Sequence, residues 1–140
     1  MKKHLFGFLT FLLFVSCQEK KAEVYDLNFI NGYWEIEQVT MADGTKKDFK
    51  INETIDFFEV KNDSGFRKKV TPQLDGTYLV NDVEEKIKIE KNQQGTYIHY
   101  KTDYAEWKES IEILTPEQLV LKNDQNIKYQ YKKPTPFSVK

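Results

Sequence analysis

Few side chains in this sequence are of the types that carry out enzymatic chemistry, and their spacing does not favour catalysis. His99 lies in an alternating run in which it shares a face with Tyr97 and Lys101. A hydrolytic triad would need a serine beside it, but neither Ser64 nor Ser110 has the sequence context of an activated nucleophile. We therefore predict that His99 is a solvated surface residue and that the protein has no catalytic residue.

Paired carboxylates are the other candidates for chemistry. Glu84 with Glu85, and Glu106 with Glu109, have residue types that serve glycoside hydrolysis or bind a hard cation. Acidic residues are also ordinary on exposed strand faces, and no other metal-binding or sugar-binding pattern accompanies them. The chain has no glycine-rich phosphate loop. We predict no metal site, no cofactor and no enzyme activity.

The only cysteine, Cys17, stands at the end of an apolar leader. A basic start is followed by eleven mainly apolar residues, 5–15, which are about half the length that a membrane-spanning helix needs. This pattern predicts a signal peptide over residues 1–16, cleaved between Ser16 and Cys17. A single cysteine also excludes disulfides within the chain and thiolate zinc sites.

The end of the leader, from Leu13 to Cys17, resembles the bacterial lipobox, in which a small residue precedes a cysteine that receives lipid. Phe14 departs from the usual leucine, and the alternative is an ordinary signal peptide with a free Cys17. The resemblance implies acyl chains on Cys17 as a membrane anchor, because two or three chains hold a protein durably on a bilayer. We expect the cell envelope, and the outer membrane in particular, without a choice between its periplasmic and surface faces.

Composition bounds the remaining possibilities. The sequence has 140 residues, of which 31% are charged, with a formal net charge of -1. This length suits one folded domain, and the charge does not favour nucleic acid, because Arg67 is the only arginine. We divide the chain into a lipidated cysteine and tether over 17–31, a folded domain over 32–133, and an extended tail over 134–140.

The folded domain reads as short β-rich runs separated by turn residues, which predicts an all-β, up-and-down antiparallel barrel of eight to ten strands. Residues 26–31 could form a short helix that plugs one end. Residues 105–114 also have helical spacing, but we favour a strand there. The expected strands cover residues 33–40, 54–61, 66–71, 77–81, 86–91, 96–102, 105–114, 119–123 and 127–132.

One face of several strands is apolar and should point inward. Adjacent Phe57 and Phe58 place aromatic rings on both faces of their strand, which indicates either a strand covered on both sides or a bulge. The expected inward sets are Trp34 and Ile36, Ile55 and Phe57, Phe66 and Val70, Ile87 and Ile89, Leu119 and Leu121, and Ile127 with Tyr129 and Tyr131.

The order of these features resembles the lipocalin-like lipoproteins of Bacteroidetes-type bacteria. Gly32-Tyr33-Trp34 opens the first strand, a meander of hairpins follows, and residues 111–121 and 128–132 close the pattern. The resemblance implies that Trp34 packs across the closed end of the barrel, beneath a basic residue of the last strand, Lys132 or Lys133. It also implies a possible binding cavity for a small apolar molecule.

Aromatic residues gather in the late strands and could line a ligand site or simply fill the core and cap its rim. The candidate ligand or partner contacts are Phe57, Tyr97, Tyr100, Trp107 and Tyr129. Our leading hypothesis is a non-enzymatic, membrane-anchored lipoprotein that binds a small apolar ligand in the cell envelope. The alternative is a protein-binding envelope module, such as an assembly factor, an inhibitor or an immunity protein.

Overall fold

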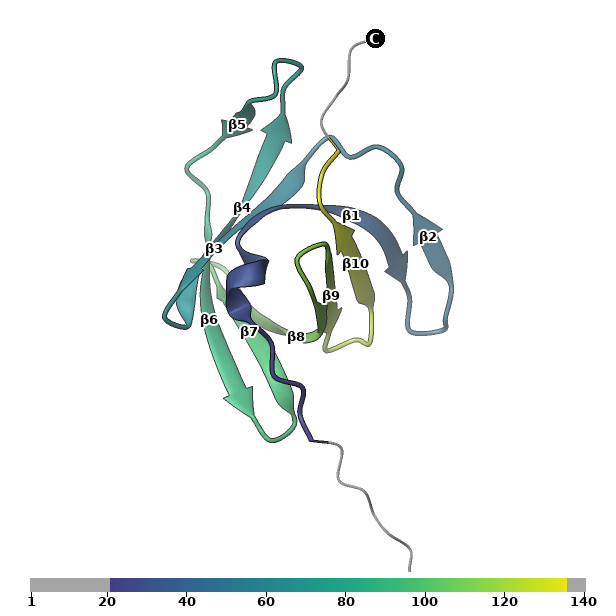
Figure 1. Ribbon diagram of the computed structural model, residues 1–140, viewed down its shortest axis with the longest axis vertical. Helices are drawn as coiled ribbons and strands as arrows, with labels where there is room; N and C mark the ends of the chain where they lie inside the picture. Colours follow the sequence, from purple (N-terminus) through teal and green to yellow (C-terminus); the bar gives the residue numbers. More distant parts are fainter. Residues whose placement is uncertain (1–20, 136–140) are drawn as a thin grey trace, which may run out of the picture.

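The computed structural model describes residues 21–135 (Figure 1). The predicted signal peptide over 1–16, the lipidation site at Cys17 and residues 136–140 of the tail lie outside this range. The elements are a short 3-10 helix, η1 (Leu27–Ile30), and ten strands: β1 (Gly32–Thr40), β2 (Lys46–Asp48), β3 (Ile55–Lys61), β4 (Ser64–Pro72), β5 (Tyr78–Val80), β6 (Glu85–Asn92), β7 (Gly95–Lys101), β8 (Glu106–Leu114), β9 (Gln118–Asn123) and β10 (Lys128–Lys132).

The strands form one antiparallel sheet that closes on itself. Their order is β10-β9-β8-β7-β6-β4-β3-β1, and β10 pairs with β1 to complete an eight-stranded barrel. The two remaining strands lie outside this ring: β2 pairs with β1, and β5 pairs with β4. The predicted up-and-down barrel, the strand over residues 105–114 and the short helix before the first strand are confirmed.

Turn residues explain the tight hairpin between β3 and β4. Asn62 and Asp63 both have positive φ, at 52° and 63°. A two-residue hairpin turn of this kind needs positive φ at both central positions, and Asn and Asp tolerate it better than most residues. The turn fixes a continuous register from Ile55 opposite Val70 to Lys61 opposite Ser64, without a bulge.

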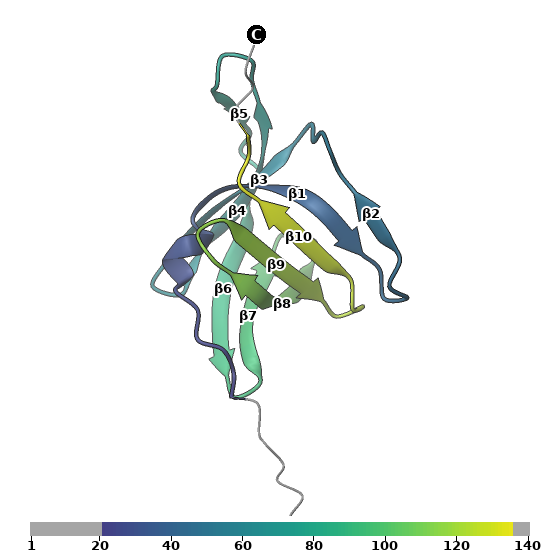
Figure 2. The ribbon, with the colours of Figure 1, turned by 45° about the vertical axis from the view of Figure 1, so that its right-hand side comes forward.

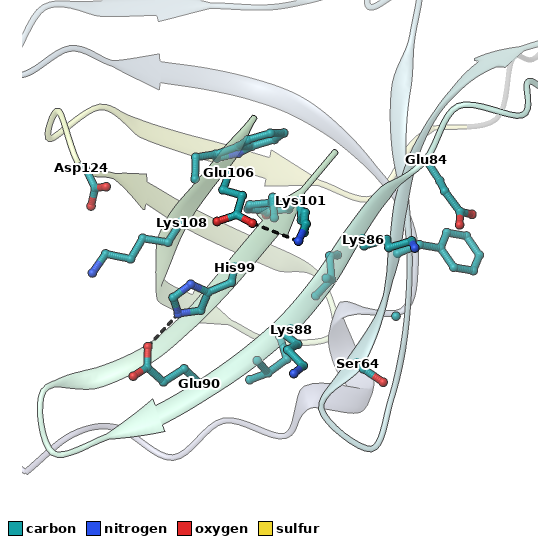
Figure 3. A pocket seen from close by; sticks show the side chains of 16 residues that line it. Ser64, Glu84, Lys86, Lys88, Glu90, His99, Lys101, Glu106, Lys108 and Asp124 are labelled. Carbon is teal, nitrogen blue, oxygen red and sulfur yellow. Dashed lines mark hydrogen bonds and ion pairs between the residues drawn. The ribbon is translucent and has the colours of Figure 1, made fainter. Parts of the chain in front are cut away.

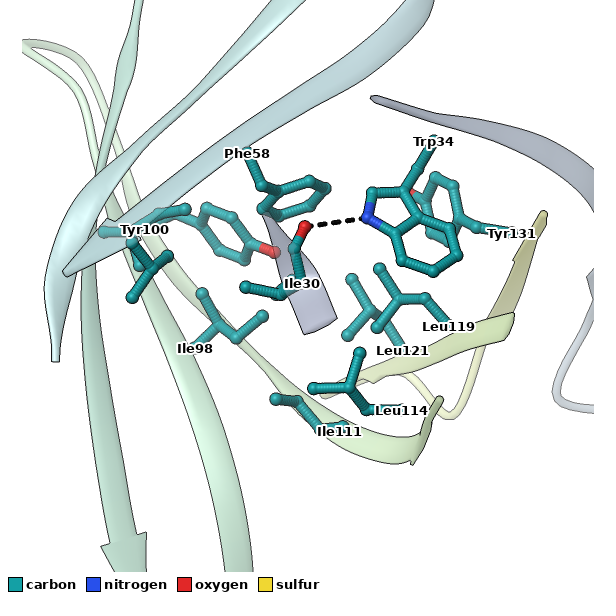
Figure 4. Packing of buried hydrophobic residues seen from close by; sticks show 12 residues of the cluster. Ile30, Trp34, Phe58, Ile98, Tyr100, Ile111, Leu114, Leu119, Leu121 and Tyr131 are labelled. Carbon is teal, nitrogen blue, oxygen red and sulfur yellow. Dashed lines mark hydrogen bonds between the residues drawn. The ribbon is translucent and has the colours of Figure 1, made fainter. Parts of the chain in front are cut away.

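The hydrophobic core lies inside the barrel, toward the end where β1 begins and β3 ends (Figure 4). Ile30 of η1 enters this core and is fully buried, and its carbonyl oxygen accepts a hydrogen bond of 2.7 Å from Trp34 Nε1. The helix therefore closes this end of the barrel, which we call the base. The buried side chains of the core are Ile30, Trp34, Phe58, Val60, Ile87, Ile98, Tyr100, Ile111, Leu114, Leu119, Leu121 and Tyr131.

A lysine covers the tryptophan at the base. Lys133 Nζ, directly after β10, lies 3.8 Å from the centroid of the Trp34 ring. Burial lowers the pKa of Lys133. Gly32, next to this contact, has a φ of 110°, a conformation that residues other than glycine rarely adopt. The placement of Trp34 under Lys133 matches what the sequence resemblance implied.

Two of the expected inward faces are wrong, those of β3 and β4. Ile55, Phe57, Phe66 and Val70 are not part of the cluster inside the barrel, which Phe58 enters instead, although Ile55 and Val70 are both 2% exposed and so are buried on the other side of the sheet. Apolar residues on both faces of β3 made the alternation ambiguous, and a shift of one residue reverses every side chain. Of the two explanations for adjacent aromatic residues on β3, a strand covered on both sides is the correct one.

The covering on the outer side is an aromatic group. Tyr33 of β1 stacks on Tyr78 of β5 with 3.9 Å between ring centroids, and Phe57 lies 4.9 Å from Tyr33 and 6.1 Å from Phe66. The β4–β5 hairpin, which projects from the barrel, thus supplies part of this second apolar layer (Figure 2). On the other side of this hairpin, the Leu79 side chain is 65% exposed.

The segment before η1 is attached to the barrel near its base. The hydroxyl of Tyr25 donates a hydrogen bond of 2.8 Å to the backbone oxygen of Glu112 on β8. From Tyr25 the chain runs back toward the turn between β6 and β7, where Lys21 and Gln94 line the same hollow (Figures 1 and 2). Within residues 21–135, no helix has the length and apolarity to span a bilayer.

Candidate ligand-binding site

A buried polar cluster adjoins the hydrophobic core inside the barrel and shares Tyr100 and Tyr131 with it. Antiparallel pairing brings the inner faces of six strands together at this level, near where β6 and β8 begin. Asp56, Arg67 and Glu109 are at most 8% exposed, which is unusual for charged residues. The members of the cluster are Asp56, Arg67, Glu85, Tyr100, Glu109 and Tyr131.

Arg67 is the centre of this cluster. Its Nε donates a hydrogen bond of 2.7 Å to Glu85 Oε2, and its Nη1 lies 3.6 Å from Glu109 Oε1. The guanidinium carbon is 4.3 Å from the centroid of the Tyr100 ring and 5.8 Å from that of Phe58, both within reach of a cation–π interaction. Arg67 thus joins charged and aromatic side chains inside the barrel.

The Glu109 carboxylate has weaker polar contacts than that of Glu85. Burial raises the pKa of Glu109, and although Arg67 and the Tyr100 hydroxyl oppose this effect, the pKa stays above its usual value. Burial also raises the pKa of Tyr100 well above its usual range, so its hydroxyl remains protonated. Among the described residues, Glu109 Oε1 and the Tyr100 hydroxyl make no hydrogen bond of normal geometry, although both are buried.

A second ion pair lies beside the first. Lys69 Nζ of β4 is 2.5 Å from Asp56 Oδ1 of β3, with the Asp56 side chain 2% exposed and that of Lys69 52% exposed. The two residues are direct neighbours across the strands. The cluster therefore contains two close ion pairs, Arg67 with Glu85 and Lys69 with Asp56, and one further carboxylate, that of Glu109.

Three of the five candidate contacts lie in the barrel interior at this end. Tyr100 and Trp107 are neighbours across β7 and β8, and their rings stack with 5.3 Å between centroids. Tyr129 packs against the same core from β10. Trp107 and Tyr129 are only half-buried, as is Ile36 on β1, so these inward side chains are partly open to solvent. We call this end the mouth.

The other two candidate contacts are not brought to the mouth. Phe57 belongs to the aromatic group outside β3. Tyr97 lies on the outer face of β7, where Lys108 Nζ is 5.3 Å from its ring centroid. The five residues predicted from their aromatic character therefore divide between the two sides of the sheet.

His99 also lies outside, in an open hollow of about 1030 Å³ over the outer face of β6, β7 and β8 (Figure 3). His99 Nε2 and Glu90 Oε2 are 2.7 Å apart, and Lys101 Nζ is 3.3 Å from Glu106 Oε1. All four side chains are largely exposed. His99 is thus at the surface, as its alternation indicated. Within residues 21–135, no three His, Cys, Asp or Glu side chains are grouped as metal ligands.

Sequence reasoning missed the role of Arg67. In the sequence, Arg67 served only as an argument against nucleic-acid binding. Because Lys68 and Lys69 follow it, Arg67 resembles part of a solvated strand face. The available signal was its register: Arg67 stands opposite Phe58, so once Phe58 points inward Arg67 must do so as well.

A closed eight-stranded meander, sealed at one end by a tryptophan beneath a lysine, defines a lipocalin-like barrel. The lipocalin-like domain family matches residues 30–121, and the chain belongs to this family. Families with this fold are generally binding proteins rather than enzymes.

Two solved structures are similar to this chain. A lipocalin-like protein from Bacteroides uniformis has 15% sequence identity and a TM-score of 0.47, with 76% of this chain and 99% of that chain covered. An uncharacterized protein from Bacteroides eggerthii has 13% identity and a TM-score of 0.47, with 74% and 98% covered. No curated protein matches the chain.

Proposed function

We propose that this protein is a non-enzymatic, lipid-anchored binding protein of the cell envelope, which holds a small and mainly apolar ligand at the mouth of its barrel. The lipocalin-like fold supports binding as the general activity. The pattern that ends at Cys17 supports the anchor.

One observation carries the placement of the ligand. Glu109 Oε1 and the Tyr100 hydroxyl are buried beside each other and beside the half-buried ring of Trp107, and neither makes a hydrogen bond of normal geometry among the described residues. A buried polar atom without a partner costs about 1–3 kcal/mol, so such atoms are uncommon unless something binds them. Aromatic walls with a few convergent polar groups are typical of small-molecule sites.

Native mass spectrometry tests this proposal. The protein is purified gently from its host and measured before and after denaturing delipidation. We expect a discrete mass beyond the covalent acyl chains, which Trp107→Ala reduces. A protein that carries no removable mass would contradict ligand binding at the mouth.

The anchor is tested separately. Cys17→Ser should abolish labelling by radioactive palmitate and release the protein from the membrane fraction, because no thiol remains to receive lipid. Labelling of this variant at the wild-type level would contradict lipid anchoring, but it would not affect the proposal that a ligand binds at the mouth.

A protein-binding module remains the second candidate, and the β4–β5 hairpin favours it. Within the described part of the chain, β5 pairs only with β4, and Leu79 and Val80 on it are 65% and 51% exposed. Exposed edge strands with apolar side chains can pair with a partner's extended segment. Cross-linking from position 80 in host cells would capture an envelope protein if this candidate is correct, and adding Leu79→Lys to the cross-linking variant should abolish the capture.

A further inference from the structure

The charges at the mouth do not balance. Three carboxylates, those of Asp56, Glu85 and Glu109, face the cations of Arg67 and Lys69. Arg67 is committed to Glu85 at 2.7 Å, and Lys69 to Asp56 at 2.5 Å. Glu109 is left with a longer contact of 3.6 Å to Arg67 and with the uncharged hydroxyl of Tyr100, although its side chain is just 6% exposed.

We infer that the ligand of the mouth carries a protonated amine on an apolar or aromatic body, and that Glu109 binds this ammonium group. This inference rests on the proposed function and names the chemical class of the ligand. A carboxylate such as Glu109 can only accept hydrogen bonds, and Arg67 at 3.6 Å and the uncharged Tyr100 hydroxyl do not give its Oε1 a close charged donor. An ammonium group supplies that donor together with the missing positive charge.

The aromatic residues agree with a cationic ligand. Tryptophan is the best aromatic partner for a cation, and Trp107 is half-buried beside Tyr100 and Glu109. Among residues 21–135, no cation lies over the ring of Trp107, whereas Arg67 already lies over Tyr100. A cation held by Glu109 can therefore interact with the indole ring.

A carboxylate ligand fits the mouth less well. Arg67 is the natural partner for it, but it would have to displace Glu85 from a charge-assisted hydrogen bond and would then lie beside Glu109 and Asp56. Like charges in a poorly solvated site repel strongly. The mouth therefore discriminates against fatty acids and other anions.

Three indole compounds that differ in one group test the inference. Tryptamine carries an ammonium group, tryptophol a hydroxyl group and indole-3-acetate a carboxylate. Binding of each to the full protein is measured by calorimetry at pH 7. We expect tryptamine to bind at least tenfold more tightly than tryptophol, and indole-3-acetate to bind most weakly, because a charged hydrogen bond contributes about 1.5–3 kcal/mol and tenfold in affinity is about 1.4 kcal/mol.

The variants follow the same logic. Glu109→Gln should lower the affinity for tryptamine at least tenfold and leave that for tryptophol nearly unchanged. Glu106→Gln is the matched control, because Glu106 lies on the same strand with its side chain 71% exposed and pairs with Lys101 outside the barrel. Tyr100→Phe removes only the hydroxyl group and should weaken tryptamine binding less. Near-ultraviolet circular dichroism establishes that each variant is folded.

Several results would overturn the inference. Preference for indole-3-acetate, equal binding of the three compounds, or tryptamine affinity unchanged in Glu109→Gln would each do so. If none of the three binds but native mass spectrometry finds a bound molecule, the ligand class is wrong and the proposed function stands. If neither method finds a ligand, both are wrong.

Discussion

We expect Arg67→Met to destabilise the protein more than the removal of any other single charged side chain. The substitution keeps most of the side-chain volume but removes the cation that faces Glu85 and Glu109. Breaking a buried ion pair from one side typically costs about 3–5 kcal/mol, because a carboxylate stays buried without compensation. Since the Glu85 side chain is 22% exposed and can regain water, we expect about 3 kcal/mol at pH 7.5.

The free energy of unfolding that Arg67→Met removes should depend on pH. Burial already raises the pKa of Glu109 above its ordinary value of 4.5, and Arg67 opposes this rise. A carboxyl group with a raised pKa in the folded state stabilises the fold below its unfolded pKa, and this contribution is lost as pH rises through the folded pKa. Without Arg67, the pKa of Glu109 in the folded protein should rise further. The variant should therefore lose the most unfolding free energy, relative to the wild type, at neutral pH and the least near pH 4.5. Tyr100, Asp56 and Glu85 face the same carboxyl group and raise or lower its pKa in both proteins.

Urea unfolding at pH 7.5 and pH 4.5 measures both effects. With a slope of about 1.5 kcal/mol per molar urea, the expected loss shifts the midpoint by about 2 M at pH 7.5. Lys68→Met is the control, because Lys68 is the next residue on β4, points outward, and should cost less than about 1 kcal/mol. Equal midpoints for the two variants, or a loss that does not shrink in acid, would refute this account of the cluster.

Three further predictions concern the base and the hairpins. Lys133→Met should lower the free energy of unfolding by about 0.5–2 kcal/mol, measured in urea, because it removes the cation 3.8 Å above Trp34; an unchanged midpoint would mean that this contact adds nothing. Gly65→Ala should cost at least about 1–3 kcal/mol, seen as a lower melting temperature, because a Cβ there would overlap the backbone oxygen of Glu59; wild-type melting would contradict this close packing. Tyr25→Phe should speed proteolytic cleavage of the segment before η1 several-fold while leaving barrel melting nearly unchanged, because it removes one hydrogen bond of about 1 kcal/mol to β8.

The sequence was most informative where turns and one-sided alternation agree. All nine expected strands lie within two residues of their expected bounds. β2 (Lys46–Asp48) was not expected, because it is three charged, exposed residues that pair only at the edge of β1 and bury nothing. Its formation depends on tertiary pairing and not on local propensity.

The site was less predictable than the fold. Tyr100, Trp107 and Tyr129 were selected for their aromatic character and do lie inside, yet the charged residues between them were not foreseen. Arg67 is followed by Lys68, and Glu109 is preceded by Lys108, so each resembles one more surface charge in its local sequence. Only the register across several strands shows that they share the interior, and that information is not local in sequence.

The attachment of the amino-terminal segment near the base has a consequence for the proposed anchor, because it would set the orientation of the whole barrel at a membrane. Lys21 is only four residues from Cys17, and an extended chain covers about 3.5 Å per residue, so the proposed lipid lies within about 14 Å of Lys21. Since Lys21 lies near the β6–β7 turn on the base side, an anchor at Cys17 would hold the base next to the bilayer and turn the mouth away from it. In that orientation the proposed ligand would reach the mouth from the aqueous phase and not sideways from the lipid leaflet. A protonated amine, which stays dissolved in water, would suit such a route.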